Sequence, residues 1–227
     1  MGILYVIATP IGNLEDITLR AVRILKEVDV IACEDTRHSR ILLDKYQINK
    51  PLVSYHAYSQ LQKIDYLVSE LKDGRNIALV SDAGTPTISD PGHVLVERAR
   101  REGVQIFSIP GPSSVSAALA VSGLSSQKFV FLGFLPKKKG RKTLFDNLRK
   151  SAEALDIETL VIFESPYRVV ETLKDFHIAL GDVQVAVCRE LTKKFEEVRK
   201  GKISDIIAHF SKCEPRGEFV ICFSTKC

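Results

Sequence analysis

The alternation of short apolar runs with helical segments is the feature that most constrains how this chain folds. Residues 3–8 and 76–80 are continuous apolar runs, as expected of strands buried on both faces of a parallel sheet. Residues 17–28 place apolar side chains three and four positions apart, which is typical of an amphipathic helix. Because parallel strands need such crossover helices, the first half predicts a mostly parallel sheet with helices on both faces.

The second half of the chain predicts another sheet of five strands. A Pro-Gly-Pro-Ser-Ser turn at residues 110–114 separates the halves, and two prolines around a glycine make it rigid. That turn is either a domain linker or a helix start whose free N–H groups hold part of a polar ligand. We predict an α/β protein of two αβα domains, residues 1–112 and 113–227. The expected strands of the second half are residues 129–132, 159–163, 183–188, 196–199 and 218–223, with 183–199 forming a hairpin.

Composition excludes several classes of protein. No apolar run reaches the roughly 18 residues that a membrane span needs. Residues 1–6 lead directly into a strand without a basic segment, so we expect no signal peptide and a cytoplasmic protein. The five cysteines form no CxxC pair and no cluster with histidine, so we expect neither a metal site nor disulfides. A net charge of +4 permits a nucleic-acid partner without requiring one.

The loop at residues 81–92 predicts a ligand site. It follows the run at residues 76–80 and precedes a helix expected at 94–102, and the carboxyl ends of parallel strands are where ligands bind. Two Gly, two Pro, two Asp and four hydroxyl side chains account for ten of its twelve positions. A simple strand-to-helix turn needs only a few residues, although an ordinary long turn is the alternative.

The other strand exits lack the motifs of common enzymes. Residues 9–13, 34–37, 163–166 and 189–191 are rich in Gly, Pro, hydroxyls and carboxylates. They contain no Walker lysine, GxGxxG, HExxH or GxSxG motif, so hydrolysis and phosphoryl transfer lack support. Backbone groups and a few carboxylates suit a polar, partly cationic small molecule.

Five motifs together resemble those of the tetrapyrrole-methylase superfamily. They are Thr9-Pro10-Ile11-Gly12-Asn13-Leu14, Cys33-Glu34-Asp35-Thr36-Arg37, Ser81-Asp82-Ala83-Gly84-Thr85-Pro86, Pro110-Gly111-Pro112-Ser113-Ser114 and Phe163-Glu164-Ser165-Pro166. The chain is similar to the branch that methylates a cytidine 2′-hydroxyl in the decoding region of small-subunit (16S) rRNA. Longer members of that branch carry a further C-terminal segment.

The resemblance implies two αβα domains with S-adenosyl-L-methionine in the cleft between them, and a homodimer. The positions that match the family's cofactor contacts are Pro10, Asp82, Ala83, Gly84, Thr85, Ser113, Ser114, Phe163, Leu191 and Phe219 or Val220. Asp82 is suited to accept hydrogen bonds from a ribose or an amine, and Gly84 allows close backbone approach.

A ribose hydroxyl is a weak nucleophile, so we expect a base to take its proton. Glu34 and Asp35 are the catalytic candidates, with a structural ion-pair cluster as the alternative. For rRNA phosphates, the candidates are Arg37, Arg40, Lys137, Lys138, Lys139, Arg141 and Lys142, with a solvated charged face as the alternative. Two other functions stay open: a small-molecule tetrapyrrole (precorrin-type) methyltransferase, and a non-catalytic RNA-binding module on the same fold.

Overall fold

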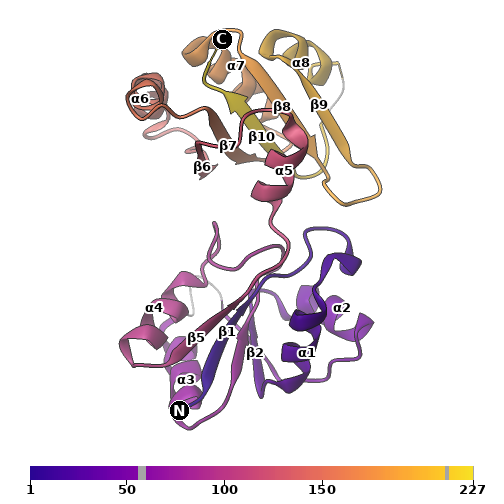
Figure 1. The fold of residues 1–227 in the computed structure, drawn as a ribbon, viewed down its shortest axis with the longest axis vertical. Coiled ribbons are helices and arrows are strands. Elements are labelled where there is room, and N and C mark those ends of the chain that lie inside the picture. The colour runs from indigo at the N-terminus through magenta and orange to yellow at the C-terminus, as the bar shows by residue number, and fades with distance from the viewer. Residues whose placement is uncertain (56–59, 213–214, 227) are drawn as a thin grey trace. The chain divides into compact units, whose positions relative to one another are not determined.

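The chain divides into two compact units, Met1–Ser113 and Ser114–Cys227, referred to below as the N-terminal and C-terminal units. The computed structural model describes residues 1–55, 60–212 and 215–226, and at residues 60, 61 and 149 it describes the backbone alone. Each unit has its own five-stranded sheet (Figure 1). In the described part of the chain, no helix combines the length and hydropathy that crossing a membrane requires.

The N-terminal sheet is entirely parallel, where the sequence predicted a mostly parallel one. Its strands lie in the order β3-β2-β4-β1-β5, with β4 at the centre. The strands are β1 (Ile3–Ile7), β2 (Val30–Cys33), β3 (Leu52–Ser54), β4 (Ile77–Leu79) and β5 (Gln105–Ile109). The helical elements are η1 (Leu14–Asp16), α1 (Leu19–Glu27), α2 (Thr36–Lys45), α3 (Gln60–Lys72) and α4 (His93–Arg101).

Helices cover both faces of that sheet. Ile7 and Ile31 belong to one core cluster with residues of α1 and α2, and Leu4 and Ile77 belong to another with residues of α3 and α4. Since successive side chains of a strand point to opposite faces, every position of the inner strands β2 and β4 is buried. That double burial explains the continuous apolar runs of the sequence.

The C-terminal sheet is mixed. Its order is β6-β7-β10-β8-β9, with β6 and β7 parallel and the remaining neighbours antiparallel, including the predicted β8–β9 hairpin. The strands are β6 (Phe129–Phe134), β7 (Thr159–Glu164), β8 (Gln184–Arg189), β9 (Glu197–Lys202) and β10 (Phe219–Ser224). The helices are α5 (Ser114–Ser122), α6 (Arg141–Ala154), α7 (Val169–Leu180) and α8 (Ile203–Phe210).

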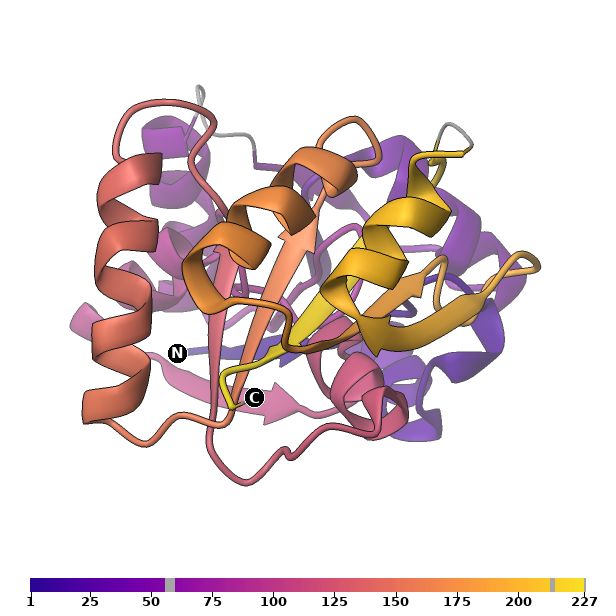
Figure 2. The ribbon, with the colours of Figure 1, turned by 90° about the horizontal axis from the view of Figure 1, so that it is seen from above.

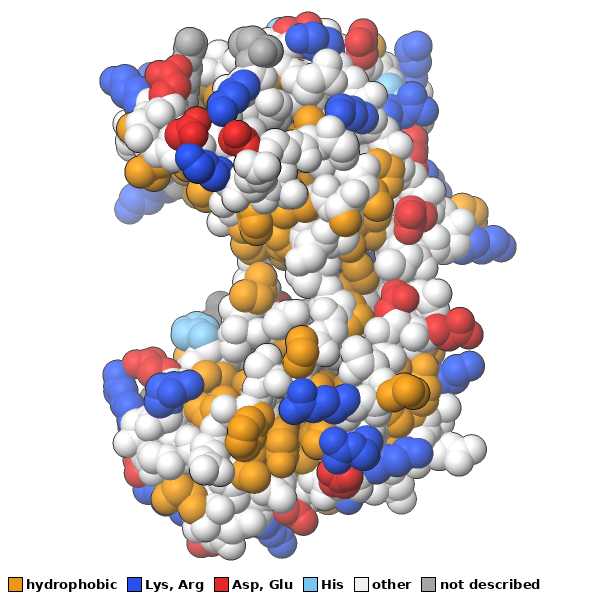
Figure 3. Space-filling view, viewed as in Figure 1, with side chains coloured by type: hydrophobic (Ala, Val, Ile, Leu, Met, Phe, Trp, Pro, Cys, Tyr) orange, Lys and Arg blue, Asp and Glu red, His pale blue; other side chains and the backbone are white. Residues whose placement is uncertain are grey.

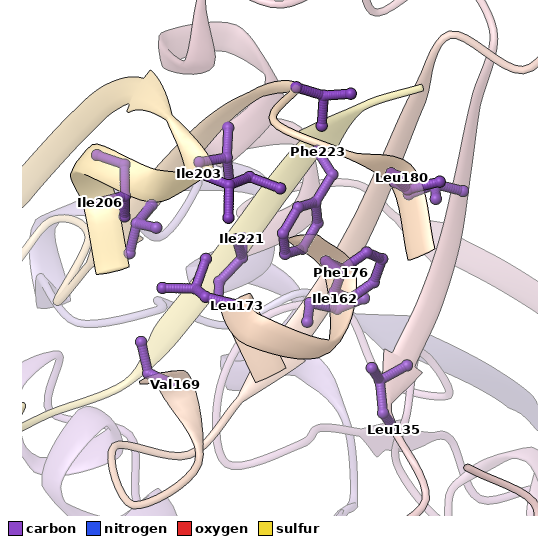
Figure 4. Packing of buried hydrophobic residues seen from close by; sticks show 14 of the residues in the cluster. Leu135, Ile162, Val169, Leu173, Phe176, Leu180, Ile203, Ile206, Ile221 and Phe223 are labelled. Carbon is purple, nitrogen blue, oxygen red and sulfur yellow. The ribbon is translucent and has the colours of Figure 1, made fainter. Parts of the chain in front are cut away.

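One face of the C-terminal sheet carries the core of this unit. Figure 2 shows α6, α7 and α8 side by side over that face. Phe176 of α7 stacks on Phe223 of β10 with ring centroids 3.7 Å apart, and Ile162, Leu173 and Ile221 lie around them (Figure 4). On the opposite face, α5 packs against β8, β9 and β10.

Helix α2 begins at Thr36, within the strand exit at residues 34–37. The helix begins there because Asp35 caps it and satisfies a free N–H of its first turn.

Cys33, Cys188 and Cys222 are buried free thiols, and burial raises the pKa of each. Cys213 and Cys227 lie outside the described residues.

Candidate functional site

The loop at residues 81–92 lies at the centre of the functional edge of the N-terminal sheet. It follows β4, which is hydrogen-bonded to β2 on one side and to β1 on the other. In a parallel sheet all strands end at the same edge, so the loops after β1 and β2 are its neighbours. Strand order thus brings the predicted site loops of this unit together.

Direct hydrogen bonds join this loop to three others. Thr9 and Gly84 exchange both backbone hydrogen bonds, N to O, at 2.9 and 3.1 Å. The backbone N–H of Asp35 donates to Asp82 Oδ1 at 3.1 Å. Thr85 Oγ1 donates to the carbonyl of Pro112 at 3.1 Å. The loops after β1, β2 and β5 are therefore all anchored to the 81–92 loop.

The 81–92 loop has strained backbone. Gly84 has φ 79°, which glycine adopts without penalty. Thr87 and Ser89 also have positive φ, 77° and 66°, where a β-carbon makes the conformation unfavourable. Such residues cost of order 1–3 kcal/mol each and cluster at ligand-binding sites.

Glu34 has an unusual environment. It follows β2, and its Oε1 is buried without a hydrogen-bond partner in the described structure. Burial, together with the negative charges of Asp90 and Asp82, raises the pKa of Glu34 to about 7. A carboxyl group that titrates near neutral pH is suited to take a proton from a hydroxyl.

Asp90 is a site residue that the sequence reasoning missed. It lies in the 81–92 loop, and burial raises its pKa, with the charge of Asp82 adding to the effect. One sequence signal could have indicated Asp90, because it is the second acid in a loop that is predicted to bind a ligand. The negative charges of Asp90 and Asp82 both raise the pKa of Glu34. No basic residue is among the groups that shift this pKa.

Asp35 differs from its neighbour Glu34. Its Oδ1 accepts a hydrogen bond from Arg37 N at 2.8 Å, as an N-cap of α2, and its Oδ2 lies 2.7 Å from Arg37 Nη2. These bonds hold the pKa of Asp35 well below its usual range. The carboxylate of Asp35 is therefore committed to the helix start, whereas that of Glu34 is not. The Arg37 side chain stays 90% exposed despite the ion pair, and Arg40 is half-buried.

In the C-terminal unit, the Phe163-Glu164-Ser165-Pro166 motif ends β7. The Glu164 side chain is fully buried and accepts hydrogen bonds from Ser165 N at 2.7 Å and Thr172 Oγ1 at 2.6 Å. Its Oε1 also lies 2.6 Å from Arg168 Nη2. Phe163 is half-buried, and the rings of Phe131 and Phe134 lie edge-on to it at 4.7 and 5.5 Å.

Arg141 does not match its predicted role in phosphate binding. It is buried, and its guanidinium donates to Thr172 Oγ1, Asp175 Oδ2 and the carbonyl of Pro136. Its charge is used inside the unit and is not presented to solvent. By contrast, Lys137, Lys138, Lys139 and Lys142 are exposed, and within the described residues no ion pair engages them.

The remaining predicted cofactor residues differ in exposure. Leu191 is buried between Glu190 and Thr192, whose positive φ values of 50° and 65° mark a second strained loop. Phe219 is 2% exposed and belongs to the core against Phe210, so its side chain is not free to meet a ligand. Pro10 and Gly84 are buried, Asp82, Thr85, Ser113 and Ser114 are half-buried, and Ala83 is exposed. Among the described residues, no group of three or more His, Cys, Asp or Glu is arranged to hold a metal ion.

Comparison with known proteins identifies the relatives of this chain. The family model for tetrapyrrole (corrin/porphyrin) methylases matches residues 3–207. The chain is 46% identical over 226 residues to a ribosomal RNA small subunit methyltransferase I of Thermotoga maritima, covering 100% of both chains. It is also 46% identical over 223 residues to that of Bacillus subtilis, covering 97% of this chain and 74% of the relative.

A solved structure of a cobalt precorrin-4 methyltransferase has a similar fold. Its TM-score is 0.72 at 21% identity, covering 97% of this chain and 94% of the other. At that identity the likeness concerns the fold alone.

Proposed function

Because this chain belongs to the ribosomal RNA small subunit methyltransferase I family of tetrapyrrole methylases, we propose that it methylates small-subunit rRNA with S-adenosylmethionine as the methyl donor. The observation that carries the proposal is the 46% identity that extends over the whole of the Thermotoga maritima relative. The acceptor atom we propose is the 2′-hydroxyl of a cytidine in the decoding region. The substrate makes the cytoplasm the proposed location, and a homodimer the proposed assembly.

The residues present fit this donor. Asp82 has one oxygen held by Asp35 N–H, and a carboxylate has enough lone pairs to accept a further ribose or amine hydrogen bond. Ala83 is exposed in this loop, and the buried Gly84 beside it fixes the loop by exchanging both backbone hydrogen bonds with Thr9. Ser113 and Ser114 lie at the start of α5, where backbone N–H groups favour a carboxylate. In the C-terminal unit we assign donor contacts to Phe163, Leu191 and the Phe219 backbone.

When bound, S-adenosylmethionine supplies an electrophilic methyl group on a sulfonium. The ribose oxygen forms a bond to that carbon as the carbon–sulfur bond breaks, and the hydroxyl proton passes to Glu34. We assign this role to Glu34 because its carboxylate has a buried, unpartnered oxygen and a pKa raised to about 7. Asp35, the other sequence candidate, serves in this scheme as the cap that aligns Asp82.

The test supplies radiolabelled donor with unmethylated small ribosomal subunits in one reaction and with a precorrin in another. Label in the cytidine 2′-oxygen of the rRNA, located by nuclease digestion and mass spectrometry, is the expected result. Label confined to the tetrapyrrole would instead make this chain a small-molecule methylase. Calorimetry with S-adenosylmethionine tests the third alternative, because a non-catalytic RNA-binding module gives no heat with correctly folded protein.

A further inference from the structure

An aromatic surface lies on the C-terminal unit outside its core. Phe131 of β6 and Phe163 of the neighbouring β7 lie on the sheet face opposite α6, α7 and α8, and Phe134 contacts Phe163. Helix α5 covers β8, β9 and β10 on that face. Hydrophobic side chains gather on the exposed surface around β6 and α5 (Figure 3). The ring of Phe134 is 59% exposed, so it has an unused face.

The backbone that carries Phe134 is held firmly. The register between β6 and β7 shifts between Phe131 and Phe134, and Gly133 there adopts φ 63°. The next two carbonyls accept hydrogen bonds from the buried Arg141 and the half-buried Arg168. Leu135 O accepts from Arg168 Nη1, and Pro136 O from Arg141 Nη1, both at 3.1 Å. The ring is therefore exposed on a fixed backbone, which lowers the entropy lost when a ligand binds.

Three cations directly follow this anchored segment. Lys137, Lys138 and Lys139 are exposed, and within the described residues no carboxylate pairs with them. Neither Arg141 nor Arg168 competes for the same ligand, because both donate inward to Glu164, Thr172 or Asp175. An exposed ring followed within a few residues by free lysines is the combination that binds single-stranded nucleic acid, in which bases stack and phosphates pair with cations.

We propose that Phe134 stacks on an unpaired base of the RNA substrate while Lys137, Lys138 and Lys139 contact the adjoining phosphates. This inference rests on the proposed function and adds a base-stacking site to it. Sequence-specific RNA recognition uses unstacked bases, and a nucleotide presented for ribose methylation has lost stacking neighbours.

Charge argues against other occupants of the exposed Phe134 ring and the lysine segment, as distinct from Phe163, which we assign to the methyl donor. S-adenosylmethionine carries a sulfonium cation, which three neighbouring lysines repel. A second copy related by two-fold symmetry would bring two sets of three lysines close together. A polyanion with flat apolar groups satisfies both the lysines and the ring.

The test measures binding of the full chain to a fluorescein-labelled, single-stranded RNA decamer by anisotropy at low salt. A decamer of the same length without bases is the second probe. We expect Phe134→Ala to weaken binding of the first decamer about five- to hundredfold, as for loss of one stacked base. Phe134→Leu should bind as weakly, since an aliphatic side chain has no π face, and Phe134→Trp should restore wild-type affinity. For the baseless decamer, wild type and Phe134→Ala should not differ.

Ile178→Ala is the matched control, because Ile178 is an equally apolar, 83% exposed residue of the same unit. Several results overturn the inference. These are unchanged affinity of Phe134→Ala for the first decamer, equal losses for both decamers, and failure of wild type to bind either probe. A loss of donor affinity in calorimetry, or a change of oligomeric state, without loss of RNA affinity overturns it too. Failure of the proposed function is separate, since it appears as absent methylation of small subunits by wild type.

Discussion

Two glutamates at strand ends, one in each unit, show how the same residue is used for opposite purposes. Glu164 ends β7, is fully buried, and is satisfied by Ser165 N, Thr172 Oγ1 and the Arg168 guanidinium. Glu34 follows β2, has a buried oxygen without a partner, and has acids for neighbours. The Glu164 carboxylate is paired with a cation and holds the fold, whereas the Glu34 carboxylate has no cation among the groups that shift its pKa, which is raised to about 7.

Burial alone does not explain the difference between Glu164 and Glu34. Taking a carboxylate out of water is unfavourable, and a protein compensates by pairing it or by letting its pKa rise. Glu164 follows the first course and Glu34 the second. We therefore expect a buried carboxylate to serve catalysis or binding where partners do not fully offset its loss of hydration, and to stabilise the fold where they do.

The largest effect is expected from Glu164→Ala. It leaves the Arg168 guanidinium, only 17% exposed, without its partner, and breaking one side of a buried pair costs about 3–5 kcal/mol. Urea unfolding followed by circular dichroism measures the free energy of unfolding. The double variant Glu164→Ala/Arg168→Met is the control and should recover much of the loss. If the single variant unfolds like wild type, the pairing of Glu164 contributes nothing to the fold.

Glu34→Gln should have the opposite profile. Loss of the base is expected to slow single-turnover methyl transfer to small subunits by about 10²–10⁴-fold, the usual contribution of a general base. The folded-state pKa of Glu34 is raised, so its contribution to stability is full at low pH and is lost as pH rises through about 7. The variant should therefore have a higher Tm than wild type at pH 8 and gain less at pH 5. Full activity of Glu34→Gln would remove Glu34 from the mechanism.

The same contrast between paired and free charge applies to cations. Replacing Lys137, Lys138 and Lys139 by Ala should weaken RNA binding. It should also reduce the slope of log K against the logarithm of the salt concentration by up to about 2, which is the value for three phosphate contacts of a single strand. Stability should hardly change, because these side chains are exposed. Arg141→Ala should instead destabilise the fold through its lost bonds to Asp175 and Thr172. An unchanged salt slope in the triple variant would mean that these lysines form only a solvated face.

Asp90→Asn provides a finer test of the acid cluster. Wild-type activity should rise with pH through about 7, as Glu34 loses its proton. Asp90 contributes negative charge that raises the pKa of Glu34, so its neutralisation should move the rate profile to lower pH. A pH series of single-turnover rates on small subunits shows the shift. A profile that stays in place, with only its height changed, would contradict the coupling of Asp90 to Glu34.

Much of the fold followed from the sequence. The apolar runs located most strands of the two sheets, because burial on both faces leaves a continuous hydrophobic pattern, as in β2 and β4. Sequence order alone did not show that β4 lies between β1 and β2, which is why the loop at residues 81–92 reaches both Thr9 and Asp35. Long-range strand pairing decides that arrangement.

The roles of individual charged residues were harder to predict. Glu34 and Asp35 are adjacent acids in one motif, and the sequence does not distinguish their roles. The structure does, because Asp35 is the N-cap of α2 and Glu34 is not. Arg141 resembles its lysine neighbours in sequence, but its partners Thr172 and Asp175 lie 31 and 34 residues away along the chain. Local pattern carries no information about such partners, so the sequence could not distinguish a buried cation from an exposed one.

The smallest effect is expected at Asp35, where the comparison with Glu34 becomes sharpest. Asp35→Ala removes the N-cap of α2 and the ion pair to Arg37, so Tm should fall by a few degrees. Asp35→Asn keeps a capping oxygen and should fall less. Methyl transfer should persist in both variants, because the bond that aligns Asp82 comes from the Asp35 backbone N–H and not from its side chain. If Asp35→Asn instead lost activity as severely as Glu34→Gln, the base would be the paired carboxylate, and the link between incomplete compensation and catalysis would be wrong.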